Sequence, residues 1–351
     1  MDFLKKEFLE SVSVGVDDKR NIVIGGYTFT INEILESIIK PDEVENAYKK
    51  EFDRWLVEDW LPPRLDYLDD ILKNHINKAR FDHLCSAIEK EIVMPFIGAG
   101  MSVPSGIPTW SDSMKRLQRL SRLEEAKLLS FLQRGAFEDA ASALLEKMPL
   151  RLFNEQLEQI YRRDHEAAIS GPIRFLPEIF SSTILTTNYD TILEDLYKNR
   201  NNAFDSILYG TGIEDYRPLR ADGSQCLLKI HGDFRLPRTR VLTKEEYDRF
   251  YLNTSKTCNE MSIILKNNSL LFLGCSLLND RTMQLMYNLS KTDENFPRHF
   301  AFMKDPKDGE KMRDREHFLA ERNISTIWYP DDHNMCLESL LVGIMDRAGV
   351  L

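Results

Sequence analysis

Six short apolar segments between residues 92 and 328 constrain the fold of this chain more than any other feature. Each ends in small or polar residues, and helical patterns separate several of them. The segments are Ile92–Ile97, Ser182–Thr187, Cys226–Ile230, Leu270–Leu273, His299–Met303 and Ile324–Trp328. Short apolar strands that alternate with helices are typical of a parallel, doubly wound sheet. We therefore predict an α/β fold with a doubly wound parallel, Rossmann-like sheet.

Two regions fall outside this alternation. Residues 112–180 have almost only helical periodicity, which predicts a helical insertion that covers the ligand-binding edge of the sheet. Residues 1–80 combine helical patterns with Gly25-Gly26 between two β-prone runs, which favours a hairpin. We expect Pro62-Pro63 to end one of the helices. The predicted domains are a mainly helical assembly region, 1–80, and a larger α/β domain, 81–351.

Charge and cysteine spacing exclude several classes of function. The chain has 46 Lys and Arg against 56 Asp and Glu, a net charge of −10, without a long basic run, so we expect no direct nucleic-acid binding. No apolar stretch approaches the ~20 residues that span a bilayer, and we expect a cytoplasmic chain without direct membrane contact. The five cysteines, at positions 85, 226, 258, 275 and 336, lack the spacing of zinc ligands, so we expect no bound metal.

Small or polar residues stand at the ends of four of the predicted strands. Gly98-Ala99-Gly100, Asn188, His231 and Gly274 occupy these positions in chain order. In doubly wound sheets the ligand lies outside the carboxyl ends of the strands, and glycines there let the backbone approach a pyrophosphate. A glycine pair after a strand is also common for structural reasons alone, and Val103-Pro104 departs from the G-x-G-x-x-G pattern. We predict that Asn188, His231 and Gly98-Ala99-Gly100 line one cleft at the carboxyl edge of the sheet.

The stretch GAGMSVPSGIPTW, residues 98–110, resembles the first nucleotide-binding motif of the sirtuin family. Three more blocks follow in that family's order: Thr186–Asp190, Ile230–Asp233 and Gly274–Ser276. The resemblance covers roughly residues 85–351. It implies that the predicted domain 81–351 is a sirtuin-like NAD-binding catalytic domain.

Departures from the sirtuin deacylases indicate the branch of the family. The two C-x-x-C pairs of the deacylase zinc ribbon are missing, and Thr109-Trp110-Ser111 stands where deacylases have Asp-Phe-Arg. The His-Gly-Asp block and the G-x-S-x-x-x-D spacing of Gly274 to Asp280 are similar to prokaryotic sirtuin-like NADases of anti-phage defence. The resemblance therefore implies that NAD is the substrate, and that the chain cleaves it to nicotinamide and ADP-ribose as the effector of an abortive-infection system.

Asn188 and His231 are the predicted catalytic residues of the implied NAD site. The amide of Asn188 offers a donor and an acceptor to the ribose or to the attacking water. His231 can accept a proton near neutral pH and is the predicted general base. The structural alternatives are that Asn188 caps a helix and that hydrogen bonds merely hold His231 in place.

The remaining predicted nucleotide-binding residues surround this pair. We expect Asp190 to bind the nicotinamide carboxamide, Trp110 to cover the nicotinamide, Ser276 to bond a phosphate or ribose hydroxyl, and Asp280 to fix the adenosine ribose. Helix capping by either aspartate and simple packing of Trp110 are the alternatives. The full predicted set is Gly98, Ala99, Gly100, Ser102, Pro108, Thr109, Trp110, Asp190, Gly274, Ser276 and Asp280.

The resemblance also implies control by a partner, because the sequence shows no segment that reads as a sensor of infection. Relatives that consist of little more than this domain are encoded beside a HerA-type hexameric ATPase, which is the expected partner; an Argonaute-like protein is the second choice. We also expect a homo-oligomer. Two other functions remain open: an NAD-dependent protein-lysine deacylase, and a non-catalytic scaffold that binds NAD or ADP-ribose.

Overall fold

The computed structural model describes residues 4–5, 7–8, 11, 22–24, 27–29, 49–50, 52–164, 167–278, 280–330 and 332–350. The chain divides into two compact units, residues 1–68 and 69–351. The boundary predicted from the sequence, between residues 80 and 81, falls inside helix α5 (His75–Glu89). None of the described helices combines the length and the apolar character that crossing a membrane requires.

The first unit contains the predicted hairpin and one unexpected helical turn. β1 (Ile22–Ile24) pairs antiparallel with β2 (Tyr27–Phe29), which confirms the hairpin. The prediction that Pro62-Pro63 ends a helix is wrong, because the π-helical turn η2 (Leu56–Trp60) leads directly into α4 (Leu61–Leu72). The two prolines lie in the first turn of α4, where the α-helical ladder needs no backbone N–H.

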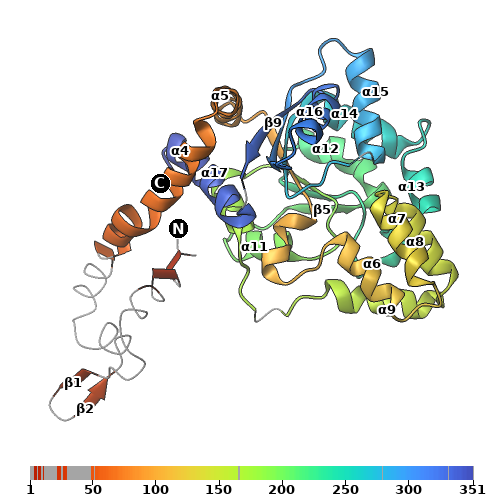
Figure 1. Cartoon of the computed structure of the whole chain (residues 1–351), viewed down its shortest axis with the longest axis horizontal. Helices are drawn as coiled ribbons and strands as arrows, with labels where there is room; N and C mark the ends of the chain where they lie inside the picture. Colours follow the sequence, from red (N-terminus) through yellow and green to blue (C-terminus); the bar gives the residue numbers. More distant parts are fainter. Residues whose placement is uncertain are drawn as a thin grey trace. The chain divides into compact units, whose positions relative to one another are not determined.

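Seven parallel strands form the sheet of the second unit (Figure 1). Their order is β5-β6-β4-β3-β7-β8-β9, and every neighbouring pair is parallel, which confirms the predicted fold class. The strands are β3 (Val93–Ile97), β4 (Ile184–Thr186), β5 (Ser206–Tyr209), β6 (Cys226–Lys229), β7 (Ser269–Leu273), β8 (His299–Lys304) and β9 (Ile324–Tyr329). After β3, the strands β4, β5 and β6 all lie on one side of β3, and the chain then crosses to β7 on the other side. The topological switch point therefore lies between β3 and β7, where such sheets bind their ligands.

Strand β5 is the one strand that the sequence analysis missed. It lies at the edge of the sheet, pairs only with β6, and all four of its residues are half-buried. The other six strands are mostly buried and read as apolar runs, whereas an edge strand of four residues lacks that pattern.

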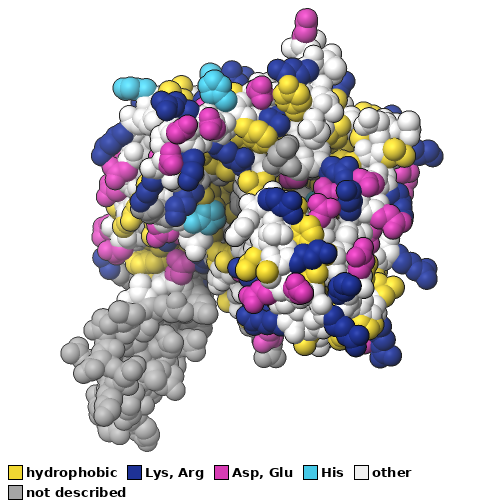
Figure 2. Space-filling view, turned by 45° about the vertical axis from the view of Figure 1, so that its right-hand side comes forward, with side chains coloured by type: hydrophobic (Ala, Val, Ile, Leu, Met, Phe, Trp, Pro, Cys, Tyr) yellow, Lys and Arg dark blue, Asp and Glu magenta, His cyan; other side chains and the backbone are white. Residues whose placement is uncertain are grey.

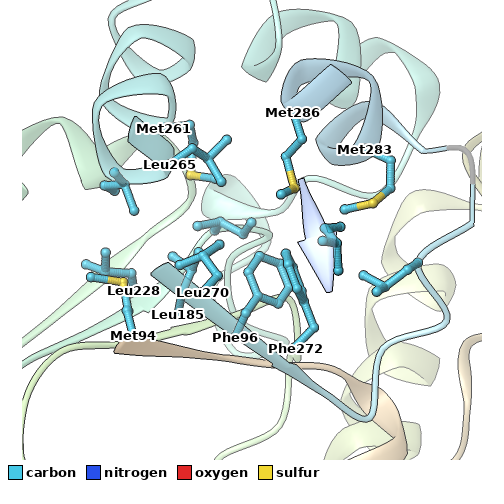
Figure 3. Packing of buried hydrophobic residues seen from close by; sticks show 14 of the residues in the cluster. Met94, Phe96, Leu185, Leu228, Met261, Leu265, Leu270, Phe272, Met283 and Met286 are labelled. Carbon is cyan, nitrogen blue, oxygen red and sulfur yellow. The ribbon is translucent and has the colours of Figure 1, made fainter. Parts of the chain in front are cut away.

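One face of the sheet packs against α14 (Lys256–Asn267) and α15 (Arg281–Thr292). Figure 3 shows the strand side chains of this core facing methionine and leucine side chains from the two helices. The labelled residues are Met94, Phe96, Leu185, Leu228, Leu270 and Phe272 from the strands, and Met261, Leu265, Met283 and Met286 from the helices. Phe96 and Phe272 are register partners on β3 and β7, with ring centroids 4.9 Å apart. This packing fixes the two central strands and with them the switch point.

The segment between β3 and β4 is helical, as predicted. It contains α6 (Trp110–Gln118), α7 (Glu125–Gln133), α8 (Phe137–Glu146), α9 (Leu150–Tyr161), the 3₁₀ turn η5 (Pro172–Phe175) and α10 (Leu176–Ile179). Helices α6 to α9 form a cluster beside the sheet (Figure 1). The ring of Tyr161, the last residue of α9, packs against the ring of Tyr189 beyond β4, with centroids 5.4 Å apart. The insertion therefore reaches the carboxyl edge of the sheet.

The helices that follow the later strands complete the second unit. They are α11 (Ile192–Lys198), α12 (Tyr216–Ala221), α13 (Lys244–Phe250), α16 (Gly309–Ala320) and α17 (His333–Arg347). Figure 2 shows one face of the molecule, on which basic and acidic side chains are interspersed. Positively and negatively charged side chains are therefore mixed on this face and do not form a continuous basic patch there.

The aromatic contact at the sheet centre gives a test of the core. Phe272→Ala should lower the free energy of unfolding by about 3–5 kcal/mol, because it removes a fully buried ring that packs on Phe96. Leu252→Ala is the control, since Leu252 is 56% exposed and its loss should change stability by about 0.5 kcal/mol or less. Urea denaturation measures both. Equal stability of the two variants would contradict this description of the core.

Candidate active site

The glycines after β3 and β7 bring two loops into direct contact at the switch point. The Gly98 N–H donates to the Leu273 carbonyl and the Gly100 N–H to the Gly274 carbonyl, both at 2.9 Å. A Cβ atom at Gly98 would lie 2.6 Å from the Gly274 oxygen, and one at Gly274 would lie 2.5 Å from the Met101 nitrogen. Gly274 also has φ +66°, which favours glycine. The two glycine motifs therefore fit against each other, and their contact with a pyrophosphate stays a prediction.

Asn188 is fixed through its donor atoms. It is buried beyond β4, and its Nδ2 donates to the Gly98 carbonyl at 3.1 Å and to Ser102 Oγ at 3.0 Å. Its backbone N–H donates to Thr186 Oγ1 at 3.0 Å. Its Oδ1 is buried and has no hydrogen-bond partner among the described residues. The side chain therefore joins the second motif to the first and leaves an acceptor for a ligand.

His231 occupies the matching position on the next strand. Thr186 of β4 and Lys229 of β6 are register partners, and Asn188 and His231 each stand two residues beyond that pair. The ring is buried, with Nδ1 3.3 Å from the hydroxyl of Tyr247, while Nε2 has no partner in the described part of the chain. Burial lowers the pKa of His231 to about 3, so the imidazole is neutral at physiological pH.

Asn188 Oδ1 and His231 Nε2 thus form a pair of unsatisfied polar atoms at neighbouring strand ends. Buried polar groups in folded proteins nearly always have a partner, so each exception calls for an explanation. One atom is an acceptor, and the other is an acceptor or a donor according to the imidazole tautomer. A bound ligand with hydroxyl groups, or an ordered water, supplies the missing partners.

A buried ion cluster that the sequence analysis missed connects the loops beyond β4 and β6. Lys229 is fully buried, and its Nζ donates to Asp233 Oδ2 at 2.5 Å, to Glu194 Oε1 at 2.9 Å and to the Asp190 carbonyl at 2.6 Å. Desolvation lowers the pKa of Lys229, but Glu194 and Asp233 outweigh it and hold the pKa above its ordinary value. The signal in the sequence was a lysine that ends an otherwise apolar strand.

Asp190 supports the local backbone. Its Oδ1 accepts from the Ile192 N–H at 3.0 Å at the start of α11. Burial raises the pKa of Asp190 above its ordinary value, although Lys229 opposes this. The carboxylate therefore closes a local turn just before α11, whose N-cap residue is Thr191 and has no side-chain cap hydrogen bond. Its contact with a carboxamide stays a prediction.

The other predicted residues between Ala99 and Trp110 lead from the first glycine motif into α6. Ala99 lies in the 3₁₀ turn η3 (Ala99–Met101), and Pro108 is buried. Thr109 caps α6, with its Oγ1 accepting from the Asp112 N–H at 3.3 Å. Trp110 is half-buried, and its ring packs edge-on against Tyr189 at a centroid distance of 5.1 Å. The structure therefore places Trp110 beside the Asn188 loop, and its contact with nicotinamide stays a prediction.

The residues predicted for the adenosine half lie beyond β7. Ser276 is exposed, and its carbonyl and that of Leu277 accept hydrogen bonds from Arg315 of α16. Asp280 caps α15 by accepting from the Met283 N–H at 2.9 Å. Asp280 is exposed to solvent as a residue, yet desolvation by the surrounding protein raises the pKa of its carboxyl group to about 6. Its capping contact is the named alternative, and a ribose contact through its other oxygen stays a prediction.

Metal-ligating side chains do not gather into groups of three or more within the described ranges. All five cysteines carry free thiols, and four of them are buried. Burial raises the pKa of the Cys275 thiol above its ordinary value.

Part of the chain is similar to a known domain and to several known proteins. Residues 182–327 match the SIR2-like domain. The chain is 25% identical over 264 residues to the NAD(+) hydrolase ThsA of Acinetobacter baumannii (strain 532279), covering 74% of this chain and 48% of that protein. It is 22% identical over 249 residues to the NAD(+) hydrolase ThsA of Bacillus cereus (strain MSX-D12), covering 66% and 50%. Defense-associated sirtuin 2 of Bacillus subtilis is 28% identical over 128 residues, or 35% of this chain and 12% of that protein. The chain spans about half the length of the ThsA proteins that it matches.

Gly98→Ala tests the contact between the two glycine motifs. The new methyl group would overlap the Gly274 carbonyl, so we expect a lower melting temperature and displaced loops. Gly212→Ala is the matched control, because nothing lies within 4 Å of its Cβ position. Thermal unfolding of both variants measures the difference. A Gly98→Ala chain as stable as the control would show that the loops do not meet as described.

The lowered pKa of His231 makes a prediction about stability and pH. Between pH 6.5 and about 3 the unfolded chain binds a proton at this residue and the folded chain does not, so this contribution to stability declines as the pH falls. Relative to His231→Gln, the wild type should lose about 1.4 kcal/mol of unfolding free energy per pH unit between pH 6 and 4. Urea denaturation at both pH values gives the difference, in which the other titrating groups cancel. Parallel pH profiles would mean that His231 is protonated in the folded chain.

Proposed function

We propose that this chain, of which residues 182–327 match the SIR2-like domain, is an NAD+ hydrolase, which cleaves NAD+ to nicotinamide and ADP-ribose. The observation that carries the proposal is the pair of buried, unpartnered atoms Asn188 Oδ1 and His231 Nε2 at neighbouring strand ends. Both belong to polar groups able to meet the ribose of a dinucleotide or a water molecule. The names of the two ThsA relatives support the same reaction.

The proposed reaction breaks the bond between ribose C1′ and the nicotinamide nitrogen. The electrons of that bond pass to the pyridinium ring, which leaves as neutral nicotinamide, and positive charge develops on the ribose. The Asn188 Oδ1 carries partial negative charge in a buried, fixed position, so it can stabilise this charge or orient the attacking water. The water then forms the new bond to C1′ and gives up one proton.

His231 is the proposed acceptor of that proton at Nε2. Its low pKa keeps the ring neutral, so the base form is already present at physiological pH. Water that adds to a cationic ribose becomes strongly acidic, and a weak base suffices to remove its proton. The imidazole needs only the correct position and a lone pair on Nε2, an atom that is buried and has no partner among the described residues.

We further propose that the chain acts in anti-phage defence and that a partner controls it. A defense-associated sirtuin among the relatives supports the defence setting, and depletion of NAD+ would stop phage growth. The expected partner is a HerA-type hexameric ATPase, with an Argonaute-like protein as the second choice. Residues 1–80 are the proposed region of self-association or docking. These partner assignments follow from the family resemblance.

Two substitutions test the chemistry. Asn188→Ala and His231→Ala should each lower the rate of nicotinamide release from NAD+ by about 10²–10⁴-fold, with the fold retained. The assay uses the chain with and without the HerA-type ATPase, and circular dichroism checks folding. His317→Ala is the control, because His317 is exposed on α16 and lies outside the proposed site.

Three results would contradict the proposal. Near-normal turnover by His231→Ala would remove its role as the base. Nicotinamide release that requires an acylated peptide would indicate a deacylase. NAD+ binding by the wild type, without nicotinamide release under either condition, would indicate a scaffold.

A further inference from the structure

Tyr247 is the hydrogen-bond partner of the His231 imidazole in the described part of the chain. It lies on α13, and its Oη is 3.3 Å from His231 Nδ1. The two rings meet edge to face, with centroids 5.0 Å apart and an interplanar angle of 72°. Tyr247 belongs to none of the four strand-end motifs, so no sequence pattern pointed to it.

We propose that Tyr247 is a positioning residue that holds His231 in the tautomer with its proton on Nδ1. In this tautomer Nδ1–H donates to the Tyr247 oxygen, and Nε2 carries the lone pair. The consequence for catalysis rests on the proposed function, whereas the tautomer itself is a property of the chain without substrate.

The argument starts from the two nitrogen atoms of a neutral imidazole, of which one is a donor and the other an acceptor. His231 is neutral, and of its two nitrogens only Nδ1 has a partner in the described structure. If Nδ1 accepted a hydrogen bond from the Tyr247 hydroxyl, the imidazole proton would sit on Nε2. Nε2 would then be a buried N–H without an acceptor and could take up no further proton. Orphaned buried N–H groups are rarer than unsatisfied acceptors. A hydroxyl oxygen can accept a hydrogen bond, so the opposite arrangement is available.

The surroundings of Tyr247 favour its oxygen as the acceptor. Burial raises the pKa of Tyr247 well above its ordinary value, and Tyr251, Asp280 and Glu138 add to the effect, so the phenol stays protonated. Arg281 opposes them, but it is itself paired with Glu138 Oε2 at 3.0 Å and Asp248 Oδ1 at 2.5 Å. The oxygen of the protonated phenol keeps lone pairs that can accept the Nδ1–H at the observed distance of 3.3 Å.

The ring of Tyr247 is itself well held. It stacks on Tyr251, with centroids 6.0 Å apart and an interplanar angle of 10°. The Tyr251 hydroxyl lies 2.7 Å from Thr282 Oγ1. At the other end of α13, Thr243 and Glu246 form a reciprocal capping box. These contacts fix the phenol oxygen relative to His231, as a positioning role requires.

The test compares Tyr247→Phe with Tyr251→Phe in the full chain. Both changes remove one hydroxyl from the same side of α13, but the Tyr251 hydroxyl bonds Thr282 rather than His231. Nitrogen-15 NMR of histidine-labelled protein without substrate reports the tautomer. The missing signal in His231→Gln identifies His231 among the seven histidines.

We expect the wild type and Tyr251→Phe to show a protonated Nδ1 and an unprotonated Nε2. In Tyr247→Phe the two signals should move toward each other, because the ring then samples both tautomers. A wild-type spectrum with the proton on Nε2, or a Tyr247→Phe spectrum identical to that of the wild type, would overturn the proposal. The wild-type result needs no turnover, so it is independent of whether the chain hydrolyses NAD+.

Kinetics give the second readout. With NAD+ as substrate, Tyr247→Phe should lower kcat by about 10–100-fold and leave KM nearly unchanged, while Tyr251→Phe stays close to the wild type. Unchanged kcat in Tyr247→Phe would overturn the positioning role. A wild type that releases no nicotinamide would contradict the proposed function and leave the tautomer to be decided by NMR.

Discussion

One buried ammonium group holds together the two strand ends that carry Asn188 and His231. Lys229 Nζ reaches the carboxylates of Asp233 and Glu194 and the carbonyls of Tyr189 and Asp190. A charge in this environment is stable only with such partners, because isolated burial of an ion is costly. Arg235 adds two hydrogen bonds of 2.8 Å to Asp233 and completes its neutralisation. Asp233 of the His-Gly-Asp block is therefore engaged in ion pairs with Lys229 and Arg235. In contrast, Nε2 of His231 in the same block has no partner among the described residues and is available to a ligand.

The sheet and the glycine motifs fix the loops on the other side of the switch point between β3 and β7 in the same way. The Gly274 turn lies against Gly98 and Gly100, at distances that leave no room for a Cβ atom at Gly98. The carbonyl of Gly98 in turn accepts from Asn188 Nδ2, which fixes the orientation of the amide and leaves Oδ1 free. Backbone contacts between β3 and β7 thus determine which atom of Asn188 is available. The proposed chemistry requires an acceptor at that position.

The sequence predicted the six buried strands and the motifs at their ends, because burial on both faces makes a parallel strand a continuous apolar run. It missed β5, whose edge position removes that pattern, and it misjudged Pro62-Pro63, which a preceding π-helical turn accommodates. It could not find Tyr247 either, because the contact of that residue with His231 depends on how α13 packs back onto the end of β6. Capping by Asp190 or Asp280 was named as an alternative, and only the folded chain shows that Asp280 caps α15 whereas Asp190 forms a local turn before α11.

The central claim is that the four strand-end motifs form one NAD+ site organised around Asn188 and His231. A crystal structure of the His231→Ala chain with NAD+ tests it most directly, because loss of the base should preserve the substrate. The account predicts that the nicotinamide ribose lies within hydrogen-bond distance of Asn188 Oδ1, with the diphosphate beside the loop of Gly98, Ala99 and Gly100. NAD+ bound elsewhere on the chain, or a dinucleotide whose ribose makes no contact with Asn188, would contradict the account.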